Sequence, residues 1–163
     1  MLKLIADLHT HTLASGHAYG TIRENAQAAA EMGLKILGTS EHGPGIPGTC
    51  DPIYFVNLRC VPDELYGVKI LRSSEINVLE GGKLSLPDRV IEYLDYAIAG
   101  IHPHCYTVLD AVSNTKNVSA ACRQTGRCAL SPIRMTTARR WIMSCCARAQ
   151  GIMMWRWRST TAP

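Results

Sequence analysis

Four short apolar segments of this chain are each followed, within a few residues, by histidine or glutamate. The first begins at Leu4 and leads into residues 7–11, which are Asp-Leu-His-Thr-His. Because side chains alternate between the two faces of an extended strand, His9 and His11 are predicted to share a face. Two imidazoles on one face of a strand can bind the same metal ion.

The other three segments repeat this arrangement farther along the chain. A strand predicted at 34–39 leads to Glu41 and His42, one beginning at 68–71 leads to Glu75, and one at 94–101 leads to His102. In a parallel sheet the carboxyl ends of the strands meet at one edge, where active sites of such folds lie. The sequence therefore predicts that these side chains converge.

The segments between the strands predict one helix and one long loop. Thr21 and Glu24 match a capping box, an alanine-rich helix follows at 26–32, and Gly33 suits a left-handed cap. Glycine and proline are frequent at 43–52, which predicts a loop beside the site. The order strand, helix, strand, loop, strand, helix, strand predicts a parallel α/β fold.

Composition places the chain among globular proteins. The 163 residues are 47% hydrophobic and 18% charged, which suits one domain with a core. Lys3, Asp7 and His9 precede any apolar run that could serve as a signal peptide, and no later stretch is apolar for long enough to cross a bilayer. We therefore expect a cytoplasmic protein without membrane contact, with its seven cysteines reduced.

Charge divides the chain into two unlike parts. All 13 acidic residues lie at or before Asp110, whereas nine of the 17 basic residues follow it. From about Cys122 onward arginine, tryptophan, methionine and cysteine crowd together, and the apolar periodicity becomes poor. We interpret residues 1–121 as the first part of a domain and residues 122–163 as a poorly structured tail translated in a shifted reading frame.

The genetic code supports this interpretation because methionine and tryptophan each have a single codon, which fixes bases in the neighbouring frame. A shifted frame under residues 132–137 permits His-Pro-Asp-Asp-Asp. Under residues 153–161 it permits Asp-Val-Ala-Leu-Glu-Val-Asn-Asn, which alternates as a strand does. The gene sequence would decide whether those codons are present.

The chemistry of the predicted site is that of a metal centre. Histidine and carboxylate ligands without thiolates suit zinc, manganese or iron, and a carboxylate can bridge two ions that activate one water molecule. A single histidine is more often a structural or exposed side chain than a ligand, but a convergence of several at strand ends favours metal. The candidate ligands are His9, His11, His17, His42, Glu75 and His102.

The motifs around these ligands resemble the PHP (polymerase and histidinol phosphatase) family, and most closely its YcdX-type phosphatases. The resemblance runs from Leu2 to about Ala121 and rests on residues 7–11, on Ser40-Glu41-His42, on Glu75 and on residues 99–102. It implies a distorted seven-stranded (β/α)7 barrel with up to three metal ions, usually zinc, that hydrolyses phosphate esters. A small phosphorylated substrate and attack by metal-bound hydroxide are implied with it.

The resemblance also implies how the ligands are shared. His9 and His11 would hold one ion, which Glu75 would bridge to a second ion also bound by His102. His17 and His42 would hold the third. The family completes its site with a later His-Pro motif and with an aspartate and a histidine in a Gly-x-Asp-x-His-like stretch, and neither occurs in this frame. We therefore expect the amino-terminal half of the barrel, with its activity impaired by truncation.

Two alternatives to an active phosphatase remain open. The chain could be a catalytically inactive fragment that still binds one or two metal ions at His9, His11, Glu75 and His102. The arginine-rich tail could instead bind nucleic acid, which we consider the least favoured, and such binding would depend strongly on salt. The sequence does not indicate the oligomeric state.

Overall fold

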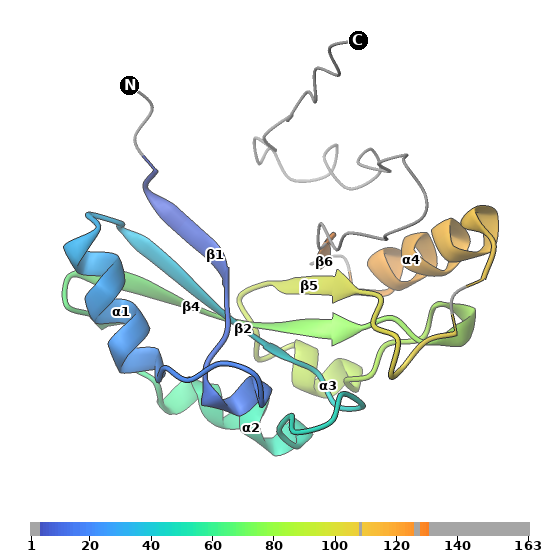
Figure 1. Ribbon diagram of the computed structural model, residues 1–163, viewed down its shortest axis with the longest axis horizontal. Coiled ribbons are helices and arrows are strands. Elements are labelled where there is room, and N and C mark those ends of the chain that lie inside the picture. Colours follow the sequence, from blue (N-terminus) through green and yellow to red (C-terminus); the bar gives the residue numbers. More distant parts are fainter. Residues whose placement is uncertain (1–3, 108, 126–127, 131–163) are drawn as a thin grey trace, which may run out of the picture.

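A computed structural model describes residues 4–107, 109–125 and 128–130 of the chain. Its centre is a parallel sheet whose strand order follows the order in the chain, with the short antiparallel β3 (Glu64–Leu65) beside β4. The sheet curls, so that the direction of β1 differs clearly from that of β4 and β5 (Figure 1). The parallel α/β prediction is confirmed, whereas β3 was not predicted. The parallel strands are β1 (Ala6–Thr10), β2 (Ile36–His42), β4 (Val68–Asn77), β5 (Ala97–Gly100) and β6 (Cys128–Leu130).

Four α-helices and three single-turn 3-10 helices connect the described strands. Helices α2 and α3 lie below the strands in Figure 1, and α1 lies against the left-hand ends of β2 and β4. The α-helices are α1 (Ile22–Glu31), α2 (Pro52–Asn57), α3 (Asp88–Ile91) and α4 (Ala111–Thr125), and the 3-10 helices are η1 (Leu13–Ser15), η2 (Leu58–Cys60) and η3 (Glu80–Gly82).

Helix α1 has the two caps that the sequence predicts. The Thr21 hydroxyl accepts the N–H of Glu24 and the Glu24 carboxylate accepts the N–H of Thr21, so the capping box is complete. Gly33 follows the helix with φ 77°, a left-handed conformation that glycine adopts without a steric penalty. The predicted helix at 26–32 is therefore confirmed, although it starts earlier, at Ile22.

Two apolar clusters fix the helices to the sheet. Ala26 and Ala29 of α1 pack against Leu37, Val68 and Ile70 of β2 and β4. A larger cluster joins the end of β4 and alternate residues of β5 to α2, α3 and α4. Burial of these side chains is the main stabilising contribution to such a fold. The larger cluster includes Phe55, Leu58, Ile76, Val78, Leu86, Val90, Ile91, Leu94, Ala97, Ala99, Tyr106 and Ala121.

The strands that carry the candidate ligands differ in length from the prediction. β2 continues through His42, because it pairs with β4 in parallel from Ile36 opposite Lys69 as far as His42 opposite Glu75. Glu41 and His42 therefore lie inside the strand and not after it. β5 is shorter than the predicted 94–101, because the Leu94 N–H is bonded to the end of α3.

The predicted boundary between residues 121 and 122 falls inside helix α4, which continues to Thr125 and precedes β6. Most of the proposed frameshifted segment, namely residues 126, 127 and 131–163, lies outside the described residues. Within the described ranges, every helix is too short or too polar to cross a bilayer.

Candidate metal centre

The six predicted ligands lie together at the carboxyl edge of the curled sheet. Strand β1 carries His9 and delivers His11 one residue beyond its end, while β2 ends at His42. β4 carries Glu75, and His102 follows β5 by two residues. The remaining predicted ligand, His17, lies in the turn after η1, where its ring centroid is 4.9 Å from that of His11. The strand order thus brings together residues that are far apart in the sequence.

The Glu75 carboxylate lies at the centre of this group and is 2% exposed. Its Oε2 is 3.3 Å from His9 Nε2 and 3.6 Å from His11 Nε2. The same oxygen is 3.1 Å from His42 Nδ1, and the other oxygen, Oε1, is 3.7 Å from His102 Nε2. Four imidazole nitrogens, carried by β1 and β2 or by residues just after β1 and β5, therefore face one buried carboxylate.

The donor atoms form three overlapping groups, and within each group all atoms lie within 4.8 Å of one another. His11 belongs to the first and second groups, Glu75 to the second and third, and His42 to the first and third. Shared ligands between neighbouring groups are what a compact cluster of ions requires. The groups are His11 with His17 and His42, His9 with His11 and Glu75, and His42 with Glu75 and His102.

Burial and charge set the protonation of these histidines. Burial lowers the pKa of His11 to about 4, and it also lowers the pKa of His102. The pKa of His9 is raised instead, chiefly because its ring is hydrogen-bonded to the Glu75 carboxylate. Since a ligating imidazole must be neutral, His11 and His102 are in the ligating form at neutral pH without bound metal.

One buried atom shows that the donor set fits a cation. His42 Nδ1 is buried and makes no hydrogen bond to any described residue, although Glu75 Oε2 is 3.1 Å away. A buried polar atom without a partner is unfavourable, and such atoms are uncommon in folded proteins. A metal ion bound between His42 and Glu75 would use that nitrogen as a ligand. Zinc, manganese and iron all accept imidazole nitrogen and carboxylate oxygen.

Asn77 holds His102 and was not identified from the sequence. Its side-chain N–H groups donate to the carbonyl oxygens of Gly43 and Pro44, so its Oδ1 faces His102 Nδ1 at 2.6 Å. His102 Nδ1 must then donate, which leaves Nε2 for a ligand. Period-two alternation along β4 could have indicated Asn77, because it lies two residues after Glu75 and thus on the same face.

The Tyr96 side chain joins the segment before β5 to strand β1. The hydroxyl donates to the carbonyl oxygen of Leu8 in β1, at 2.5 Å. Gly38 of β2 allows this contact, because a Cβ at that position would lie 1.9 Å from the Tyr96 hydroxyl. Tyr96 therefore holds β1, the strand that carries His9, against the rest of the sheet.

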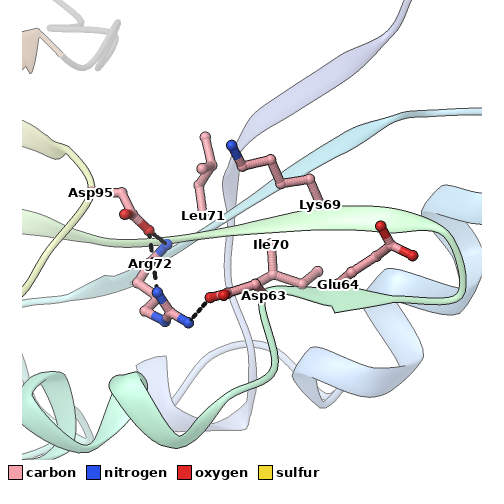
Figure 2. Close-up of a pocket in the computed structure, with 7 residues that line it drawn as sticks. All are labelled: Asp63, Glu64, Lys69, Ile70, Leu71, Arg72 and Asp95. Carbon is pink, nitrogen blue, oxygen red and sulfur yellow. Dashed lines mark hydrogen bonds and ion pairs between the residues drawn. The ribbon is translucent and has the colours of Figure 1, made fainter.

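The arginine with the clearest structural role lies outside the donor groups. The Arg72 guanidinium donates to the carbonyl oxygens of Leu58 and Val61 and to the Asp63 carboxylate. Figure 2 shows this side chain turned to Asp63, while its backbone N–H contacts Asp95, beside an open hollow of about 490 Å³. The hollow is lined by both acidic and basic side chains. Arg72 is therefore occupied in joining loops to β4.

Comparison with known proteins gives relatives for part of the chain. It is 47% identical over 116 residues to a protein of Clostridium acetobutylicum named "Probable phosphatase", covering 71% of this chain and 48% of the relative. A "Probable phosphatase" of Clostridium novyi is 46% identical over 115 residues, covering 70% and 47%. One of Thermoanaerobacter is 43% identical over 119 residues, covering 72% and 49%.

The chain spans about half the length of the curated relatives it matches. No family model matches the chain. These relatives are named probable phosphatases, and the histidine and glutamate groups of this chain are of a kind that could hold metal ions.

Proposed function

We propose that this chain carries the first part of a metal-dependent phosphatase of the PHP family, a half-barrel of the (β/α)7 type. The observation that carries the proposal is the Glu75 carboxylate, buried within reach of four imidazole nitrogens and shared by two of the three donor groups. The names of the curated relatives support phosphate-ester hydrolysis as the reaction class.

Zinc is the ion we expect first, in up to three positions, with manganese or iron as alternatives. All six ligands offer imidazole nitrogen or carboxylate oxygen, which these ions accept. When bound, such ions lower the pKa of a coordinated water molecule and neutralise charge on phosphoryl oxygens. The ligands are His9, His11, His17, His42, Glu75 and His102.

The residues of this chain would prepare that chemistry in two ways. Burial keeps His11 and His102 neutral, so both can bind metal at neutral pH. The shared Glu75 carboxylate would hold two ions near each other and supply negative charge to balance them. The substrate that suits such a site is a small phosphorylated molecule.

The three donor groups also support a second function, metal binding alone. In this alternative the chain binds one or two ions at His9, His11, Glu75 and His102 without turnover. The two functions share the metal and differ in hydrolysis, so a single assay with two readouts separates them.

The test uses the full chain, treated with chelator and then supplied with zinc, manganese or ferrous iron. Hydrolysis of p-nitrophenyl phosphate and the amount of bound metal are measured together. The proposal predicts metal-dependent turnover that is lost in Glu75→Gln and His102→Ala. His104→Ala is the matched control, since His104 is exposed and belongs to none of the donor groups.

Three outcomes decide between the functions. Turnover that needs metal and Glu75 supports the phosphatase. Bound metal that depends on Glu75 without turnover supports the inactive fragment. Absence of bound metal in the folded native chain contradicts both.

We also propose that the reading frame changes near residues 122–132. This rests on the single codons of methionine and tryptophan and on the absence of acidic residues after Asp110. Sequencing the source gene across these codons tests it. Codons that cannot encode the His-Pro-Asp-Asp-Asp stretch in the shifted frame would contradict it.

A further inference from the structure

Ser15 lies at the middle of the first donor group, although it belongs to none of the three groups. It is the last residue of η1 and is 1% exposed. Its hydroxyl oxygen lies 2.9 Å from His11 Nδ1 and 2.5 Å from Glu41 Oε2, and it accepts the backbone N–H of His42 at 3.1 Å. One hydroxyl thus contacts two of the candidate ligand residues and one buried carboxylate.

The protons of this network can be counted. A serine hydroxyl has one hydrogen to donate and two lone pairs to accept with. Glu41 Oε2 already accepts the Thr12 N–H at 3.0 Å, so it acts as an acceptor here and the Ser15 hydrogen points to it. The His42 N–H fills one lone pair of the hydroxyl. The remaining lone pair can only accept from His11 Nδ1, which must therefore carry hydrogen.

We propose that Glu41 and Ser15 are positioning residues that fix the tautomer of His11, with hydrogen on Nδ1 and a free lone pair on Nε2. This inference rests on the proposed function for its purpose, since a free Nε2 is needed only if His11 binds metal. His11 Nε2 is the nitrogen that faces Glu75, at 3.6 Å. A carboxylate behind a metal-binding histidine is a recurrent arrangement, and here a serine hydroxyl is interposed.

Ser15 acts on the other two members of the donor group as well. Its backbone carbonyl lies 3.1 Å from His17 Nδ1, which can donate to it and leave Nε2 free. Its hydroxyl holds the backbone of His42 at the end of β2. The three histidines of one candidate ion site are therefore all oriented by one residue.

Glu41 anchors this arrangement without belonging to the ligand set. It is fully buried in β2, next to His42, and its Oε2 accepts from both Thr12 and Ser15. The donor atoms that lie within 4.8 Å of one another include none from Glu41 in the described residues. Glu41 is adjacent in sequence to the candidate ligand His42. Its carboxylate, however, contacts Ser15 and Thr12 and belongs to none of the donor groups.

The direct test is the tautomer of His11 in the metal-free full chain, read from long-range nitrogen-proton correlations in an NMR spectrum of the 15N-labelled protein at neutral pH. We expect hydrogen on Nδ1 and a bare Nε2. A native chain whose His11 carries hydrogen on Nε2 would overturn the proposal. This readout needs neither metal nor turnover, so it stands even if the proposed function fails.

Two variants of Glu41 separate the role of its acceptor oxygen from that of its volume. In Glu41→Met the Ser15 hydroxyl loses its acceptor and can donate to His11 Nδ1, so the tautomer is expected to shift to hydrogen on Nε2. Glu41→Gln is the matched control, because an amide oxygen can accept from Ser15 and Thr12 as Oε2 does. It is expected to keep the native tautomer.

Ser15→Ala provides an independent measurement if Glu41→Met fails to fold. Loss of the hydroxyl leaves His11 Nδ1 without its acceptor, so we expect both tautomers and a zinc affinity about 10- to 100-fold weaker in chelator competition. Native tautomer and native zinc affinity in folded Ser15→Ala would overturn the proposal. A native chain with the expected tautomer but no zinc binding would leave this network intact and contradict the proposed function instead.

Discussion

Strand β4 carries two charged side chains three residues apart, Arg72 and Glu75, and their surroundings are opposite in kind. The Arg72 guanidinium meets two backbone carbonyls and the Asp63 carboxylate, so its charge and its donors are matched by acceptors. Glu75 meets imidazoles, of which His11 and His102 have lowered pKa values and are neutral at pH 7. The first region is complete in itself, whereas the second presents ligands suited to a cation.

Within one strand, the Arg72 contacts serve the stability of the fold and the Glu75 contacts serve the candidate metal site. A closed network of matched donors and acceptors joins loops to the sheet and needs no further partner. The imidazole and carboxylate donors around Glu75 instead converge in groups that could hold a cation. We therefore expect changes at Arg72 to affect mainly unfolding, and changes at Glu75 to affect mainly metal binding.

The largest effect is expected for Glu75→Gln. The substitution keeps the volume but removes the charge shared by two donor groups. Loss of a direct ligand should exceed the loss from an outer-shell partner, so zinc affinity is expected to fall by at least about 100-fold. Chelator competition measures it. An unchanged zinc affinity would contradict the distinction between the Glu75 site and the Arg72 network.

The next effect is expected for Arg72→Met, which removes the Arg72 donor to the Val61 carbonyl and leaves the Leu58 carbonyl with only the Val61 N–H as its donor. Unpaired buried acceptors are costly, and we expect the free energy of unfolding to fall by about 1–3 kcal/mol, with zinc affinity unchanged. Urea denaturation measures the loss. Lys69→Met is the matched control, since Lys69 is an exposed cation of the same strand. Equal losses in the two variants would contradict the role of the Arg72 network.

A smaller effect is expected from acid on the metal-free chain. The pKa of His11 is lowered to about 4 from 6.5, so the unfolded chain binds more protons between these values and stability falls as the pH drops through them. His102 acts in the same direction. His9 opposes it, because its raised pKa favours the folded state at low pH.

We expect a net loss of roughly 1–2 kcal/mol between pH 7 and pH 5, dominated by His11. Urea denaturation at several pH values measures it. In His11→Gln the dependence should be shallower. A free energy of unfolding that rises toward pH 5 in the native chain would contradict the lowered pKa of His11.

The smallest effect is expected for Tyr96→Phe, which removes one hydrogen bond between β1 and the segment before β5. A single hydrogen bond contributes about 1 kcal/mol, so the free energy of unfolding should fall by about that amount. The comparison is sharpened if zinc affinity also falls slightly, because Tyr96 holds the strand that carries His9. No change in either measurement would contradict that role.

Five of the six candidate ligands could be predicted to converge because each lies in or just past an apolar strand, whereas His17 lies in the turn after η1. The capping box at Thr21 and Glu24 likewise identified helix α1. These features are local, since the pattern of apolar residues and the cap are contained in a few consecutive positions. The parallel order of the strands followed from their alternation with helices.

The supporting residues could not be predicted in the same way. Ser15 lies in a short 3-10 turn, and its partners Glu41 and His42 are more than 25 positions away. β2 extended past its apolar part only because β4 pairs with it through His42 and Glu75. Such features depend on tertiary contacts, which no short window of sequence contains.

The measurement that tests the central claim most directly is anomalous diffraction at the zinc edge from crystals of the full chain grown with zinc. We predict strong anomalous peaks within bonding distance of the Glu75 carboxylate and of His9, His11, His42 or His102, and none at the Arg72 network. Zinc bound only at other sites, with no peak beside Glu75, would contradict it.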